Sequence, residues 1–168
     1  TASKAITINT DSMNIVGGIF NANTLAASKN LNIAGGTINT NNITAGIIDG
    51  VNNGGQLTIT GGAITTTNVT AGGQLSVMSG VSSTGSLSLN GDGGVTISGS
   101  AGISSGDNLS ITSSNGITLT GAYELTANGT VELNTANMNI TTGTINANTL
   151  AASGALTISD GTINATNV

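Results

Sequence analysis

The feature that most constrains this chain is an 18-residue repeat nested within a longer repeat of 125 residues. The segment MNIVGGIFNANTLAASKNLNIAGGTINTNNI begins at Met13, and MNITTGTINANTLAASGALTISDGTINATNV begins at Met138. Within each copy the 18-residue unit starts again, at Leu31 and at Leu156, and a further unit starts at Leu57. Glycine-rich repeats without a helical period are typical of stacked strands, so each unit is predicted to form one turn, or rung, of a solenoid.

Large apolar residues recur at the same positions of these units. Positions 1 and 3, 8 and 10, and 13 and 15 form pairs spaced by two, which places both side chains of a pair on one face of a strand. Positions 10 and 15 hold only Ala or Thr. We therefore predict three short strands per rung with these side chains facing inward. The predicted core residues are Met13, Ile15, Phe20, Leu25, Leu31, Ile33, Ile38, Ile43, Leu57, Ile59, Ile64, Val69, Met138, Ile140, Ile145, Leu150, Leu156, Ile158 and Ile163.

The corners of the rung are marked by glycine and asparagine. Position 6 is always glycine, as expected where the chain needs a positive φ or has no room for a Cβ. Asparagine at positions 11 and 12 suits the second corner because it tolerates the left-handed region. The predicted corner glycines are Gly18, Gly36, Gly62, Gly143 and Gly161.

The rest of the chain fits the same scheme with looser corners. Successive rungs of 18 to 26 residues begin at Met13, Leu31, Leu57, Leu75, Val95, Ile117, Met138 and Leu156. The 26-residue rung matches its neighbour if residues 47–54 are looped out at a corner. Upstream, Ile6 and Ile8 resemble the third strand of a rung. We predict an all-β fold over residues 1–168, a right-handed single-stranded parallel β-helix (β-solenoid) of triangular section that continues into a longer fibre.

The composition agrees with a narrow core. Only Phe20 and Tyr123 are aromatic, and a solenoid needs a single layer of aliphatic side chains per rung. Apolar residues make up 37% of the chain and recur in register, which argues against disorder.

Residue types suited to catalysis are few. The chain has no His and no Cys, which removes the common general base, the thiol nucleophile and most zinc sites. Its Asp residues are scattered at predicted corners, and Glu124 and Glu132 are expected to point outward. We expect no enzyme activity, no catalytic, cofactor-binding or metal-binding residue, and no cofactor. A polysaccharide-acting β-helix enzyme, which would require clustered carboxylates, is a less favoured alternative, as is a phage tail-fibre segment.

Two surface patterns suggest other functions. The segment Asn90 to Gly94, NGDGG, faintly resembles a calcium-binding turn, but such turns work in register and this one occurs once. Outward Thr-x-Thr pairs at Thr58/Thr60 and Thr118/Thr120 favour an ice-binding solenoid as the alternative function. The pairs are interrupted in other rungs, as at Asn14/Val16, so strand propensity explains them as well.

The charge limits the partners. Lys4 and Lys29 are the only basic residues and the formal net charge is −5, which disfavours nucleic acid and anionic membranes. We also expect no membrane insertion, because no sufficiently long apolar run is present.

The segment GGQLTITGGAITTTNVTAGGQLSV, residues 54–77, resembles the repeat region of filamentous-haemagglutinin-type exoproteins, adhesins secreted by the two-partner pathway. The resemblance extends over nearly the whole chain. It implies an extracellular or cell-surface shaft with an adhesive, biofilm-matrix or self-associating role. Its partners would be other copies, flanking repeats of the same polypeptide, or host-surface and matrix glycans. The chain has no proline, and so lacks the NPNG-type motif of that family's secretion domain.

The chain also shows a weaker resemblance to chlamydial-type autotransporter passengers, in the segments GGAI, which begins at Gly61, and FNAN, which begins at Phe20.

Overall fold

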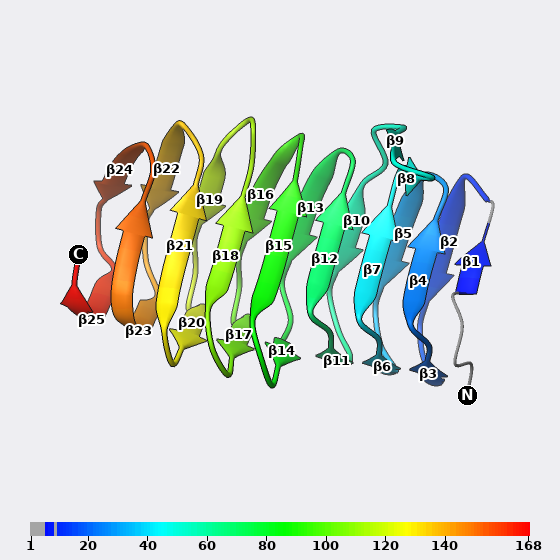
Figure 1. The fold of residues 1–168 in the computed structure, drawn as a ribbon, viewed down its shortest axis with the longest axis horizontal. Coiled ribbons are helices and arrows are strands. Elements are labelled where there is room, and N and C mark those ends of the chain that lie inside the picture. Colours follow the sequence, from blue (N-terminus) through cyan, green and yellow to red (C-terminus); the bar gives the residue numbers. More distant parts are fainter. Residues whose placement is uncertain (1–5, 9) are drawn as a thin grey trace.

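The computed structural model describes residues 6–8 and 10–168, and the chain there consists of strands and turns without a helix. Residues 1–5 and 9, which include Lys4, lie outside the described residues. Parallel strands stack into a β-solenoid of about eight turns (Figure 1). The all-β parallel β-helix predicted from the repeat is therefore confirmed.

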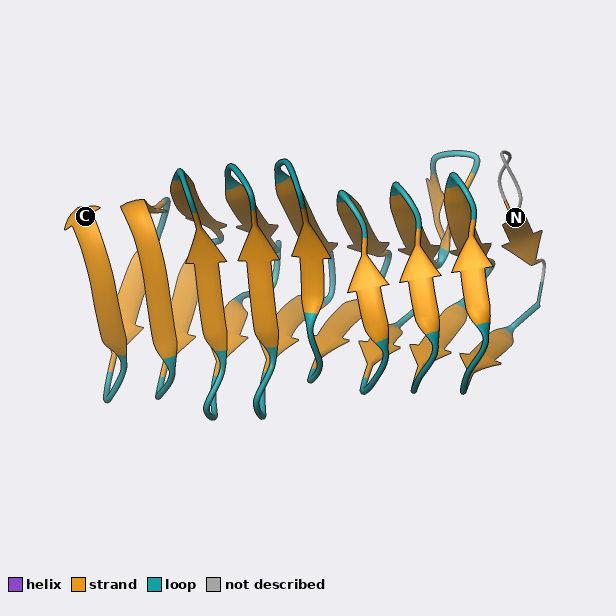
Figure 2. Ribbon diagram, turned by 90° about the horizontal axis from the view of Figure 1, so that it is seen from below, coloured by secondary structure: helices purple, strands orange, loops and turns teal. Residues whose placement is uncertain are grey.

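Each rung contributes strands to three faces of the solenoid (Figure 2). The first face contains β2 (Ser12–Ile15), β5 (Asn30–Ile33), β10 (Leu57–Ile59), β13 (Gln74–Val77), β16 (Gly94–Ile97), β19 (Ile117–Leu119), β22 (Asn137–Ile140) and β24 (Ala155–Ile158). The second face contains β3 (Ile19–Asn21), β6 (Thr37–Asn39), β11 (Ala63–Thr65), β14 (Val81–Ser83), β17 (Gly102–Ser105), β20 (Glu124–Ala127), β23 (Thr144–Ala152) and β25 (Thr162–Asn167). The third face contains β1 (Ile6–Ile8), β4 (Thr24–Ala27), β7 (Asn42–Ala45), β12 (Asn68–Ala71), β15 (Leu87–Gly91), β18 (Leu109–Thr112), β21 (Thr130–Asn134) and the second half of β23.

The coil is right-handed. In Figure 1 the third-face strands ascend in front, the first-face strands descend behind them, and successive rungs advance from right to left. This is the hand that connections between parallel strands of one sheet nearly always adopt.

The register of the first face confirms the rung boundaries. The residues predicted to begin the rungs pair in one continuous ladder, in the order Met13, Leu31, Leu57, Leu75, Val95, Ile117, Met138 and Leu156. Upstream, β1 pairs with β4 and places Ile6 opposite Leu25, so the chain enters on the third face as predicted.

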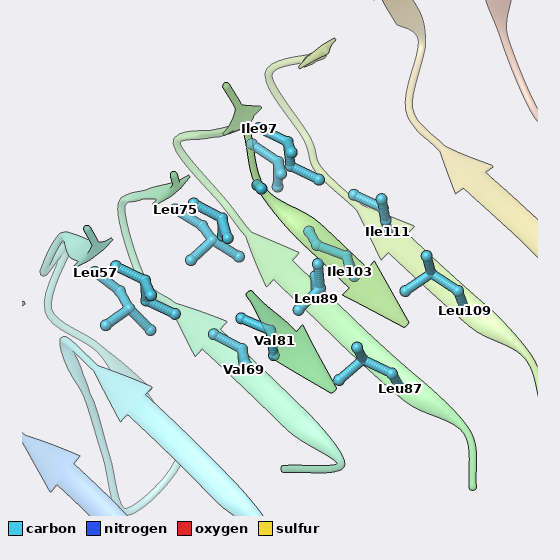
Figure 3. Packing of buried hydrophobic residues seen from close by; sticks show 14 of the residues in the cluster. Leu57, Val69, Leu75, Val81, Leu87, Leu89, Ile97, Ile103, Leu109 and Ile111 are labelled. Atoms are coloured by element: carbon cyan, nitrogen blue, oxygen red, sulfur yellow. The ribbon is translucent and has the colours of Figure 1, made fainter. Parts of the chain in front are cut away.

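The core is one layer of aliphatic side chains that runs the length of the solenoid. Figure 3 shows Leu57, Leu75 and Ile97 from the first face and Val69, Leu89 and Ile111 from the third. Because each side chain packs on its counterparts in the rungs before and after, burial is complete at inner positions. Each fully buried large aliphatic contributes about 1.5–3 kcal/mol relative to exposure.

The predicted core residues differ in burial between inner and terminal rungs. The buried ones are Ile15, Leu25, Leu31, Ile33, Ile38, Ile43, Leu57, Ile59, Ile64, Val69, Met138, Ile140, Ile145 and Leu150. Met13, Phe20, Leu156 and Ile163 are half-buried against the core. The prediction is wrong for Ile158, whose side chain is 43% exposed. Its strand, β24, ends the first face and has a neighbour, β22, on one side only.

The third face departs from the repeat alignment. The sequence makes Leu150 equivalent to Leu25, but the ladder that starts at Leu25 passes through Leu89 and reaches Ala152 instead. The shift enters at β15, whose five residues include a second inward leucine, Leu87. A displacement of two residues leaves every side chain on the same side of the strand, so the apolar pattern does not reveal it.

Each predicted corner glycine meets at least one of the two expected requirements. Gly18, Gly36, Gly62 and Gly143 have φ values of 93 to 99°. At Gly36 a Cβ would also lie 2.8 Å from the carbonyl oxygen of Gly18 in the neighbouring rung. Gly161 is outside the positive-φ group, but a Cβ there would lie 3.0 Å from Cγ2 of Ile140.

Residues 47–54 project from the third corner of the second rung. Within them β8 (Ile47–Ile48) and β9 (Val51–Asn52) pair antiparallel with each other (Figure 1). In the next rung the Gly72 N–H donates to Ala45 O at 2.8 Å, and the adjacent Gly73 N–H donates to Gly55 O at 2.8 Å. Gly72 and Gly73, which are adjacent in the chain, thus stack on the segments immediately before and after residues 47–54. The projection itself lies outside the stack of rungs.

Candidate functional site

Buried hydroxyl groups line the corners inside the solenoid. The side chains of five of these residues are buried, namely Thr40, Thr66, Ser83, Ser105 and Ser113. The Ser113 hydroxyl, for example, donates to Gly91 O in the neighbouring rung at 2.9 Å. These hydroxyls satisfy corner carbonyls that would otherwise be buried without partners. The sequence showed only that these positions are small, and their polar role depends on the corner geometry.

Ionisable side chains are dispersed over the surface. Lys29 and Asp11 form an exposed ion pair at 3.0 Å. Glu124 accepts a hydrogen bond from the Asn146 amide at 2.8 Å, and Asp107 accepts one from the Ser86 hydroxyl at 3.0 Å. Within residues 6–8 and 10–168, no three acidic side chains gather closely enough to hold a metal ion. The carboxylates of the described residues are therefore dispersed rather than clustered.

Asp92, in the segment that resembles a calcium-binding turn, holds the projecting hairpin. Its Oδ2 accepts a hydrogen bond from Asn52 Nδ2 at 2.6 Å, and Asn52 Nδ2 also lies 2.9 Å from Gly72 O. On the other side, Asn115 Nδ2 donates to Asp92 O at 3.1 Å. Asp92 thus connects the hairpin to the rungs beyond it. Its hydrogen bond with Asn52 joins residues that are 40 positions apart in the chain.

Asparagine side chains form ladders on the outside of the stack. In five pairs the side-chain amide nitrogen of one residue donates to the amide oxygen of its counterpart in the preceding rung, at 2.8–2.9 Å. These pairs are Asn14 with Asn32, Asn21 with Asn39, Asn23 with Asn41, Asn42 with Asn68 and Asn146 with Asn164. Such ladders reinforce the register of stacked strands.

A shallow groove of about 700 Å³ lies on the outside of the first face. It extends across β13, β16, β19, β22 and β24. Its floor carries one outward side chain from each of the last four of these strands, namely Thr96, Thr118, Asn139 and Thr157. Asn115 and Asn137 line it from the corner side.

The groove exposes neutral hydrogen-bonding groups. The Thr96 hydroxyl lies 3.3 Å from the Gln74 amide nitrogen. Among the described residues, the side chains of Thr118, Asn139 and Thr157 make no hydrogen bond to protein. No lining residue is ionisable. The groove can therefore exchange hydrogen bonds with an uncharged ligand rich in hydroxyl or amide groups.

The second outward column of the first face is irregular. It contains Val16, which is 73% exposed, and Met78, which is 38% exposed, beside threonines such as Thr60 and Thr120. Between the two Thr-x-Thr pairs noted in the sequence, this column holds Met78 and Ser98, so the threonines do not form a continuous ladder.

Tyr123 lies inside the first corner of its rung. It is 1% exposed, and its hydroxyl has no hydrogen-bond partner among the described residues. Its ring packs against Gly143, where a Cβ would lie 2.5 Å from Tyr123 Cε1. Burial raises the pKa of Tyr123 to about 12. The phenol therefore acts as a packing element and stays protonated at neutral pH.

Comparison with known proteins found no family model, no curated protein and no solved structure that matches this chain. Membership of the filamentous-haemagglutinin-type exoproteins accordingly stays a prediction. In the part of the chain that the structure describes, no helix has the length and apolar character required to cross a membrane.

Proposed function

We propose that this chain is a structural shaft segment of an extracellular or cell-surface fibre of the filamentous-haemagglutinin type. Its role would be to space or display other parts of an adhesin, or to build a biofilm matrix by self-association. The observation that best supports this proposal is the uniform stacking: apart from the projecting hairpin, each inner strand pairs with counterparts in the rungs on both sides.

The dimensions suit a spacer. With strands about 4.8 Å apart, eight rungs extend over about 40 Å. The core is continuous along this length, so the segment should behave as a rod. A rod needs no catalytic cluster, which is consistent with the dispersed carboxylates.

The two ends of the described stack favour continuation. Strands β24 and β25 pair on one side only, as do β2 and β3 at the other end. Near these edges Leu156, Met13 and Phe20 are half-buried, and Ile158 is 43% exposed. Open backbone edges beside apolar side chains are templates for further strand pairing. The partners in this proposal are other copies of the chain or flanking repeats of the same polypeptide.

Sedimentation velocity and electron microscopy of this chain test the proposal. We expect fibres of constant width that lengthen with protein concentration. Ile158→Asp should shorten or abolish them and leave the fold intact, because this side chain is already partly exposed. Thr157→Asp, on the outer face of the same strand, is the matched control and should still assemble. A wild-type protein that stays monomeric at high concentration would contradict the proposal.

A further inference from the structure

We propose that the groove on the first face binds a neutral, extended polysaccharide chain, whose hydroxyl groups exchange hydrogen bonds with Thr118, Asn139 and Thr157. The binding surface lies along the side of the solenoid. It does not require fibre assembly, and its test does not depend on the outcome of the assembly experiment.

The shape of the groove selects an elongated ligand. It crosses five adjacent strands of the first face, from β13 to β24. At about 4.8 Å per strand, the groove is about 20 Å long and runs parallel to the solenoid axis. One hydrogen-bonding side chain per rung gives a regular spacing, comparable with the length of a single sugar ring in an extended glycan.

The side chains of the groove are free to bind a ligand, unlike those of the asparagine ladders. On the same face, Asn32 donates to Asn14 at 2.8 Å, so these amides are partly satisfied by each other. Asn139 lies in register between Thr118 and Thr157, and none of these three side chains forms a hydrogen bond with the described part of the chain. Their partners in the free protein are water molecules, which sugar hydroxyls can replace.

The lining of the groove favours a neutral ligand over an acidic one. Its lining holds no ionisable side chain, and the protein carries a formal net charge of −5, which disfavours acidic glycans. The lining also lacks an aromatic ring, because Tyr123 is buried and Phe20 lies in the first rung. A single groove should therefore bind weakly, with a dissociation constant of about 1 mM. Repetition along a fibre would raise the avidity.

Nuclear magnetic resonance titration of the ¹⁵N-labelled protein is the direct test, carried out in the Ile158→Asp background so that fibre assembly does not broaden the resonances; Ile158 does not line the groove. The probes are cellohexaose, xylohexaose and chitohexaose, three neutral oligosaccharides, with a hexamer of galacturonic acid as the charged comparison. We expect at least one neutral probe to shift amide resonances of β16, β19, β22 and β24 and to leave the second face unchanged. If none of the three neutral probes shifts these resonances, or if the acidic hexamer binds better, the proposal is wrong.

Matched variants locate the binding. Thr118→Lys should fill the groove and weaken binding at least tenfold, while Thr58→Lys, at the same position of the ladder but outside the groove, should bind like the wild type. Asn139→Leu provides a second loss of binding if Thr118→Lys fails to fold. Unchanged affinity in folded Thr118→Lys and Asn139→Leu would overturn the assignment. Inhibition of ice growth that Thr118→Lys abolishes, without saccharide binding by the wild type, would assign the face to ice instead.

Discussion

A charge placed in the interior ladder of the first face should disrupt folding. Ile59 is fully buried at 0% exposure and lies in register between Ile33 and Val77. Loss of an isoleucine side chain from such a site costs about 2–5 kcal/mol. A carboxylate left there without a partner adds several kcal/mol. The sum is comparable with the whole stability of an ordinary domain, which is about 5–15 kcal/mol.

The matched change is on the neighbouring residue. Thr58 points outward between Asn32 and Ser76, where an added carboxylate stays in contact with water. Thr58→Asp should therefore change the free energy of unfolding by about 0.5 kcal/mol or less. In a chain of this length, about 1 kcal/mol shifts the melting temperature by about 2–4 °C. Ile59→Asp should lose more than about 10 °C or fail to fold.

Thermal melts followed by far-ultraviolet circular dichroism distinguish these outcomes. Ile33→Asp, one rung earlier in the same ladder, should behave like Ile59→Asp. Equal melting temperatures for Ile59→Asp and Thr58→Asp would refute the assignment of inward and outward faces.

Three further predictions concern the projection, the corner glycines and the buried tyrosine. Deleting residues 47–54 should leave a folded solenoid, because the flanking chain already stacks on adjacent residues of the next rung; loss of the β-type circular dichroism signal would show that the projection is part of the rung. Gly143→Ala should cost about 1–3 kcal/mol or more, because its φ is 96° and the added Cβ meets the ring of Tyr123. Gly17→Ala, where a Cβ meets nothing within 4 Å, should be nearly neutral in the same urea titration. Burial raises the pKa of Tyr123 from 10.0 to about 12. Between pH 10 and pH 12 the folded protein therefore keeps a proton that the unfolded chain loses. The free energy of unfolding should keep its full value below pH 10 and fall by about 2–3 kcal/mol towards pH 12. Tyr123→Phe should abolish that fall, and the same pH profile of the urea midpoint in Tyr123→Phe and in the wild type would contradict the burial of the phenol.

The rung boundaries and the inward positions of the first two faces could be predicted from the sequence. In a solenoid each residue packs on its counterpart one rung away, so the same size and polarity recur at a fixed interval. The alternation within each strand then separates inside from outside. The ladder from Met13 to Leu156 was predictable for this reason. The exposure of Ile158 was not predictable, because the repeat does not distinguish an inner rung from a terminal one.

The candidate site was not predictable in the same way. The sequence predicts that Thr118, Asn139 and Thr157 face outward, but the groove depends on how neighbouring rungs stack and on which side chains lack hydrogen-bond partners within the protein. Neither property is periodic. The hydroxyls at the corners and the contact between Asn52 and Asp92 likewise depend on distances set by the stacked backbone.

The sequence by itself determined that the chain coils into stacked rungs and which side of each strand faces the core, because both follow from periods of 18 and of two residues. Only the tertiary structure decided the register of the third face, where Leu150 is displaced by two residues from its sequence equivalent. The physical reason is that a two-residue shift preserves every inward and outward assignment. The shift begins where β15 adds an inward leucine, Leu87, before Leu89, and each later rung keeps it because that rung stacks on the one before it.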